Sequence, residues 1–140
     1  MFNADPNRAG ATLLRISLGL MYVAHSVVLK YFIYTLNGTA EYFESIGLPA
    51  FLAYVVFAAE MVGGALLILG IRTRVVSLAL VPVLVGATWA HIGNGWVFSN
   101  ANGGWEYPLY LIVISVVVAL QAEPSKRKEA AFSGNRAEVV

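Results

Sequence analysis

Four long apolar stretches dominate the pattern of residues along the chain. They run over residues 9–34, 48–71, 75–97 and 103–121. Each has about the 17 to 25 residues that an α-helix needs to cross a bilayer. The sequence therefore predicts an all-α fold, an integral membrane bundle of four transmembrane helices within residues 1–122. The polar and basic residues 123–140 are expected to form a disordered tail.

The basic residues outside these stretches predict the orientation in the membrane. They lie before the first stretch, between the second and third, and after the fourth: Arg8, Arg72 with Arg74, and residues 126–128. Short cytoplasmic loops retain Lys and Arg. We therefore expect both termini, including the tail, to be cytoplasmic. The connections 35–47 and 93–104 contain no basic residue and are expected on the opposite side.

Composition supports a multi-pass protein of the inner (plasma) membrane. Hydrophobic residues make up 59% of the 140 residues and charged residues 12%, with a mean hydropathy of +0.71, which a soluble surface does not accommodate. The net charge of +1 gives no reason to expect a nucleic-acid partner. The chain has no cysteine, which excludes thiol redox chemistry and cysteine-ligated iron–sulfur clusters. Any redox role therefore requires a bound cofactor.

Glu60 lies in the middle of the second apolar stretch. A carboxylate at this depth costs roughly 2.5 kcal/mol or more, so it is usually paired and often functional. At about 1.5 Å per residue, Arg15 lies about 9 Å and Glu60 about 14 Å from the inner edge. An arginine side chain can bridge this difference. We therefore predict a structural ion pair between Arg15 and Glu60.

A second polar layer is predicted in the outer half of the bundle. His25 and His91 each lie sixteen residues into their apolar stretches, or about 24 Å from the inner side. Glu106 and Lys30 fall near the same height. Three tryptophans occupy the same outer half: Trp89, Trp96 and Trp105. They either line a cofactor pocket with this layer or form an aromatic belt at the membrane interface.

The spacing of small and polar residues predicts which faces point inward. One face of the first helix carries Arg15, Gly19, Tyr22 and Ser26 at steps of three and four residues. Gly63 and Gly64 share the face of Glu60, and small residues allow two helices to approach closely. Pro82 is expected to kink the third helix.

The order and spacing of several motifs identify a family resemblance. The motifs are Arg15 with Leu18-Gly19-Leu20, His25, Lys30, Glu60 with Gly63-Gly64, Leu69-Gly70 before Arg72 and Arg74, His91 with Gly93 and Trp96, and Gly103-Gly104 with Glu106-Tyr107-Pro108. Together they resemble the DoxX family of small four-helix membrane proteins, which is related to the DoxD subunit of thiosulfate:quinone oxidoreductase. The resemblance implies a four-helix bundle and an association with membrane redox systems, including quinone reduction.

Two functional hypotheses follow. In the first, the protein is a quinone-associated subunit or accessory protein of a membrane redox complex, and is not an enzyme on its own. Its quinone would lie in the outer half, where His25 and His91 donate hydrogen bonds and Glu106 relays protons. In the second, the polar residues only lock the helices together in a structural or assembly subunit. Both hypotheses imply a larger membrane complex or a homo-oligomer.

Other cofactors remain open at this point. His25 and His91 could ligate haem b axially from different helices. A metal held by His25, His91, Glu60 and Glu106 is not predicted, because Glu60 lies too deep to share the layer.

Overall fold

The computed structural model describes residues 6–122, and every regular element in that range is helical. The elements are α1 (Pro6–Val23), η1 (Ala24–Ile33), α2 (Leu36–Ser45), α3 (Phe51–Leu69), α4 (Thr73–Ala79), α5 (Val81–His91), η2 (Ile92–Asn94) and α6 (Glu106–Gln121). The prediction of an all-α protein is confirmed for these residues. The expected tail, residues 123–140, lies outside them.

Three helical segments are long and apolar enough to cross a membrane. They are Pro6–Ile33, which joins α1 to η1, then Phe51–Leu69, and finally Thr73–Asn94. The segment Glu106–Gln121 is apolar but shorter, with 16 residues. The chain is therefore membrane-like along most of its described length.

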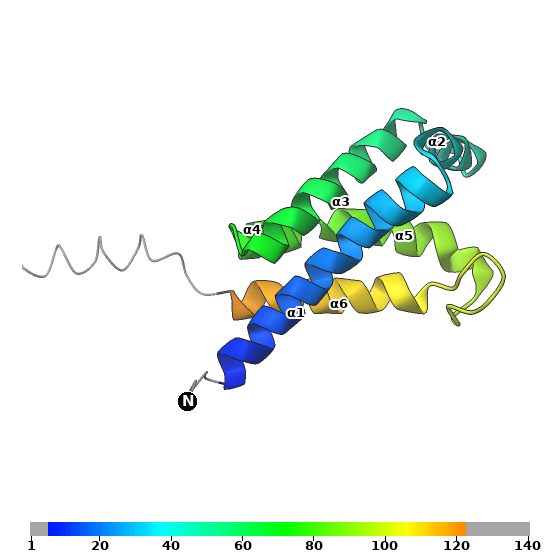
Figure 1. The fold of residues 1–140 in the computed structure, drawn as a ribbon. Coiled ribbons are helices and arrows are strands. Elements are labelled where there is room, and N and C mark those ends of the chain that lie inside the picture. The colour runs from blue at the N-terminus through cyan, green and yellow to red at the C-terminus, as the bar shows by residue number, and fades with distance from the viewer. Residues whose placement is uncertain (1–5, 123–140) are drawn as a thin grey trace, which may run out of the picture.

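Figure 1 shows how the ends of these segments are grouped. The start of α1, the α3–α4 turn and the end of α6 lie at one end of the molecule. The α2 helix and the connection between η2 and α6 lie at the other. Arg72 lies in the α3–α4 turn and Arg74 in the first turn of α4. This basic pair therefore shares an end with the N-terminus of α1.

Close contact between α1 and α3 depends on two glycines. A Cβ atom on Gly19 would lie 2.7 Å from the Gly64 carbonyl oxygen, and one on Gly64 would lie 2.7 Å from the Gly19 carbonyl oxygen. Gly63 likewise leaves room for the side chain of Leu80. The interfacial role predicted for Gly63 and Gly64 is therefore confirmed.

The buried interior mixes leucines with small hydroxyl groups. Its apolar members are Leu18, Tyr22, Leu67, Leu80, Leu84, Leu111 and Val118. The side chains of Ser26, Ser77 and Ser115 are fully buried, whereas many large apolar side chains are exposed, including Leu13, Phe32 and Leu120. This distribution suits a protein surrounded by lipid, where apolar surface needs no shielding from water.

The helix that contains Pro82, where a kink was predicted, is interrupted at one residue. The α4 helix ends at Ala79 and α5 begins at Val81. Proline has no N–H to donate to the carbonyl four residues earlier, and its ring crowds that carbonyl. The interruption at Leu80 follows from this lost hydrogen bond.

The connection 35–47 contains a helix that the sequence analysis did not identify. Thr35 begins α2 with a positive φ of 62°, and its Oγ1 accepts a hydrogen bond from the Gly38 N–H at 3.1 Å. Thr39 and Ala40 are buried, and the Tyr54 hydroxyl on α3 donates to Asn37 Oδ1 at 3.0 Å. The α2 helix therefore packs across the ends of its neighbours.

Candidate intramembrane polar site

Glu60, in the middle of α3, forms an ion pair with Lys30, which lies near the end of the first apolar segment. Lys30 Nζ donates to Glu60 Oε2 at 2.6 Å, and the two side chains are 16% and 7% exposed. Lys30 comes from η1 and Glu60 from α3. The pair therefore joins two of the three candidate spans. Paired charges in such segments are costly to bury and commonly mark functional sites.

The predicted Arg15–Glu60 ion pair is wrong. The Arg15 guanidinium donates instead to the carbonyl oxygens of Leu67 and Ile68, the latter at 3.0 Å. These carbonyls belong to the last turn of α3, where the helix dipole is negative and few backbone N–H groups are left to donate; of the two, the Leu67 carbonyl also accepts the Gly70 N–H at 3.1 Å. Arg15 therefore lies level with the end of α3, about two turns from Glu60, and caps that end.

The segment that carries His25 and Lys30 is a ten-residue π-helix, η1, which continues α1. It ends with a hydrogen bond from the Tyr34 N–H to the Leu29 carbonyl at 2.8 Å, five residues back. The π-helix is rare, and short π segments recur at functional sites. Depth counted with α-helical rise, which had placed Lys30 in the outer layer, away from Glu60, does not apply along this segment. No spacing signal in the sequence predicted it.

His25 lies about one π-helical turn before Lys30, and two interactions hold its ring. Its Nδ1 lies 3.0 Å from the Met21 carbonyl oxygen, and its ring stacks on Tyr107 with centroids 6.1 Å apart. It also interacts electrostatically with Glu60. When Nδ1 donates to Met21, the neutral imidazole has Nε2 as its acceptor. His25 can therefore exchange a proton through Nε2 while its ring stays fixed.

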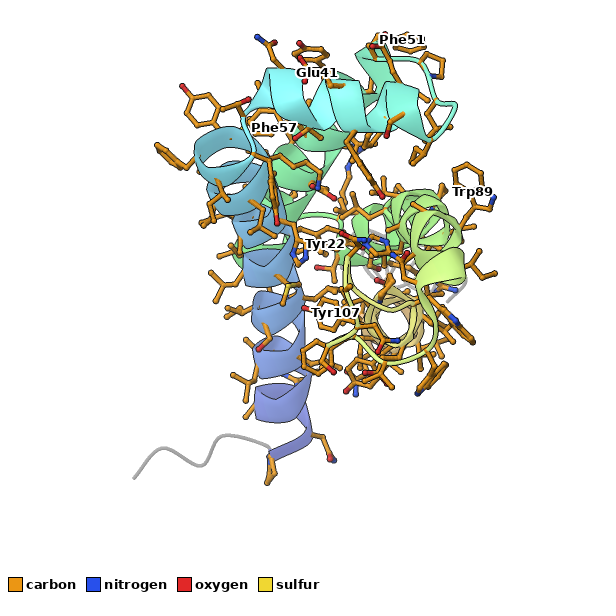
Figure 2. The ribbon with its side chains drawn as sticks, turned by 90° about the vertical axis from the view of Figure 1, so that its right-hand side faces the viewer. Tyr22, Glu41, Phe51, Phe57, Trp89 and Tyr107 are labelled. Atoms are coloured by element: carbon orange, nitrogen blue, oxygen red, sulfur yellow. The ribbon has the colours of Figure 1, made fainter. Side chains whose placement is uncertain are left out.

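Two tyrosines extend this network toward α6. The Tyr22 hydroxyl lies 3.5 Å from Ser115 Oγ and interacts electrostatically with Glu60. The Tyr107 hydroxyl donates to Met21 Sδ at 2.6 Å. Figure 2 shows both rings between α1 and α6. The sequence placed Tyr22 on the inward face but assigned it no role in the site. We call Tyr22, His25, Lys30 and Glu60 the polar cluster.

The remaining residues of the predicted outer layer gather elsewhere, around the α5–α6 connection. His91 Nδ1 lies 2.8 Å from the Ala87 carbonyl oxygen, and a Cβ on Gly103 would lie 3.4 Å from its ring. Glu106 Oε1 accepts a hydrogen bond from the Phe98 N–H at 2.9 Å. Glu106 thus holds the connection in place.

The three tryptophans do not surround the polar cluster. Trp96 and Trp105 pack edge to face, with centroids 4.5 Å apart. Trp89 is about half exposed and projects outward from α5 (Figure 2). Within residues 6–122, no three His, Cys, Asp or Glu side chains gather in a group that could hold a metal ion.

Comparison with known proteins adds a family. Residues 10–93 match the DoxX family, a range that includes the polar cluster. The chain is also 41% identical over 111 residues to the Bacillus subtilis (strain 168) protein described as "Putative oxidoreductase CatD", covering 79% of this chain and 78% of that protein. No solved structure matches the chain. The family match and this relative agree with the motifs described above: the chain belongs to the DoxX family.

Proposed function

We propose that the protein is a membrane-embedded subunit or accessory protein of a redox complex, and that it binds a quinone at the polar cluster. One observation carries the proposal: a buried Lys30–Glu60 ion pair with His25 beside it, inside segments long enough to cross a membrane. The description of the relative as an oxidoreductase supports a redox role.

The donors of the polar cluster fit the chemistry of a quinone. A quinone offers two carbonyl oxygens that accept hydrogen bonds, and its reduction takes up two electrons and two protons. The Lys30 ammonium is a donor, and so is Nε2 of His25 when the ring is protonated; in a region of low dielectric such hydrogen bonds are strong. Glu60 balances the charge of Lys30. The sequence placed His25 and His91 in one layer as donors to the quinone. Since His91 lies at the α5–α6 connection, the proposal assigns this role to His25 alone.

Electrons must come from a second protein in this proposal. The chain has no cysteine, and amino-acid side chains of the polar cluster exchange protons, not electron pairs, with a quinone. The partner is therefore a redox protein with its own electron carrier, such as a flavin or haem. This chain would bind the quinone, orient its carbonyl oxygens and exchange protons with it.

The proposed membrane arrangement has four spans and both termini in the cytoplasm. The 16 residues of α6 extend about 24 Å, which makes α6 a short fourth span. The grouping of the N-terminal end of α1, the α3–α4 turn and the end of α6 (Figure 1) fits this arrangement. Arg72 and Arg74 then lie on the cytoplasmic side, as expected for the inner membrane.

A structural or assembly role is the second candidate, and one observation favours it. Among residues 6–122, no buried side-chain nitrogen or oxygen lacks a hydrogen-bond partner. A fully satisfied network rigidifies a bundle without any ligand. This role predicts that the polar cluster can be replaced by apolar side chains without loss of function.

A binding titration separates the two candidates. Purified protein in nanodiscs is titrated with a short-chain ubiquinone or menaquinone, and intrinsic tryptophan fluorescence reports binding. We expect saturable binding to the wild type and at least tenfold weaker binding to the double variant Lys30→Met, Glu60→Leu. The control Glu44→Gln, at an exposed position of α2, should bind normally. Equal affinity of all three proteins would refute the quinone site.

A further inference from the structure

The connection between α5 and α6 presents an apolar tip. Residues 95–105 contain no charged side chain. Trp96, Val97 and Phe98 are 51%, 45% and 66% exposed. Three consecutive exposed apolar side chains would be unfavourable in water. The surroundings of this connection therefore need an explanation separate from that of the polar cluster.

The connection is bonded to itself and to its flanks. Its backbone forms two bonds across the base, from the Trp105 N–H to the Gly95 carbonyl at 3.2 Å and from the Glu106 N–H to the Trp96 carbonyl at 3.1 Å. At the tip, the Glu106 carboxylate accepts from the Phe98 N–H. Much of the polar backbone is thereby satisfied without water.

Asparagine side chains satisfy two further carbonyls. Asn100 Nδ2 donates to the Asn94 carbonyl at 2.9 Å, and Asn94 Nδ2 donates to the Asn102 carbonyl at 3.1 Å. Gly104 allows the two halves of the connection to approach closely, because a Cβ there would lie 2.3 Å from the Val97 carbonyl oxygen. Non-helical backbone at membrane depth requires internal hydrogen bonds of this kind.

The length of α6 places this connection below the membrane surface. The 16 residues of α6 extend about 24 Å, whereas the hydrocarbon core is about 30 Å thick. If α6 ends near the cytoplasmic boundary, its first residue, Glu106, lies several ångströms inside the opposite boundary. The last residues of the connection, which precede Glu106, must then lie within the membrane.

We propose that residues 95–105 form a membrane-immersed loop whose tip, Trp96-Val97-Phe98, lies among the lipid acyl chains just below the outer headgroups. Glu106 positions this tip through the Phe98 N–H. The proposal depends on α6 crossing the membrane and not on quinone binding. It assigns the tip to lipid rather than to another protein, because residues 95–105 carry no charged side chain and internal hydrogen bonds satisfy much of their backbone.

Fluorescence quenching of Trp96 tests the proposal. Trp89→Phe and Trp105→Phe leave Trp96 as the single tryptophan, and the protein is reconstituted in phosphatidylcholine–phosphatidylglycerol vesicles. Lipids brominated at shallow or deep acyl positions report contact with lipid, and acrylamide reports contact with water. The control replaces Trp96 with Phe as well and carries Glu44→Trp at an exposed position of α2.

We expect the shallow bromolipid to quench Trp96 several-fold more than it quenches the control, and acrylamide to quench Trp96 several-fold less. Acrylamide quenching equal to that of the control would overturn the proposal, since the tip would lie in water. Protection of Trp96 from both quenchers would also overturn it, because protein would then cover the tip.

A matched pair of glycine variants tests whether the tight loop sets this depth. Gly104→Ala forces the Val97 carbonyl away, whereas nothing lies within 4 Å of a Cβ on Gly93. In the variant that keeps Trp96 as its single tryptophan, Gly104→Ala should at least double the acrylamide quenching, and Gly93→Ala should leave it unchanged. Unchanged quenching in both variants would contradict a loop held at depth by its packing.

Discussion

At the scale of single residues, the account depends on a carboxylate and an ammonium group that share an apolar environment. The attraction between Glu60 and Lys30 at 2.6 Å offsets the cost of removing both charges from water. Either charge alone would lack this compensation. The free energy of unfolding should therefore respond very differently to single and double substitutions at this pair.

Removing one partner should destabilise the bundle more than removing both. Glu60→Gln is expected to lower the free energy of unfolding by about 3 kcal/mol, because Lys30 keeps a buried charge. The double variant Lys30→Met, Glu60→Leu should recover most of that loss. Chemical unfolding in detergent measures both, with Glu44→Gln as the control. A double variant less stable than Glu60→Gln would contradict the account.

Arg15 should contribute stability as a helix cap. Arg15→Met removes the guanidinium donor from the Leu67 and Ile68 carbonyls at the negative end of α3, and a loss of about 1–2 kcal/mol is expected. The control is Arg74→Met, because Arg74 is exposed on α4. The same unfolding assay applies. If both variants match the wild type, the capping role is incorrect.

Residue patterns predicted that Glu60 would be paired, but not its partner. A charged residue within an apolar stretch can be recognised from the sequence as paired, because burial makes a partner necessary. The partner depends on where each helix starts and on its local pitch. Counting α-helical rise placed Arg15 near Glu60, whereas Arg15 reaches the end of α3 and Lys30, on the π-helix η1, forms the pair.

At the scale of elements, the packing of α1 on α3 follows from glycines on facing surfaces. Gly19 and Gly64 each leave space for the other's backbone. The spacing of small residues predicted that these glycines lie on inward faces, because helical periodicity is local; it did not predict that they meet each other. The α2 helix and η1 were missed for the opposite reason: α2 is short and depends on packing against its neighbours, and the π form has no distinct periodic signal.

A methyl group at this contact should separate the two helices. Gly64→Ala places a Cβ 2.7 Å from the Gly19 carbonyl oxygen, whereas nothing lies within 4 Å of a Cβ on Gly86. We expect Gly64→Ala to cost about 1–3 kcal/mol of unfolding free energy. Gly86→Ala, in α5, should be neutral or slightly stabilising. Equal stability of the two variants would show that the α1–α3 approach is looser than described.

At the scale of the whole molecule, the two ends differ in charge. Arg72 and Arg74 lie at the end that carries the start of α1 and the end of α6, and α2 with Glu41 and Glu44 lies at the other (Figure 1). The four-span arrangement predicted from the sequence stays a prediction, because three segments meet the length of a full span and α6 is shorter. Hydropathy predicts a membrane protein, but it does not decide whether a short last helix crosses the membrane.

The absence of cysteine makes this arrangement easy to test. Single-cysteine variants Ser45→Cys on α2 and Arg74→Cys on α4 are exposed to a membrane-impermeant maleimide in intact cells. Ser45→Cys should react, and Arg74→Cys should react only after the membrane is permeabilised. Reaction of both in intact cells, or of neither, would contradict opposite sides.

Quinone binding at the polar cluster can be measured directly in protein purified gently out of its native membrane. Small molecules are extracted from this protein, and quinones are quantified by mass spectrometry. We expect about one quinone per protein for the wild type and for His91→Ala, whose ring lies at the α5–α6 connection. The folded double variant Lys30→Met, Glu60→Leu should retain almost none. Quinone absent from the wild type, or retained equally by the double variant, would contradict the claim and favour a structural or assembly role.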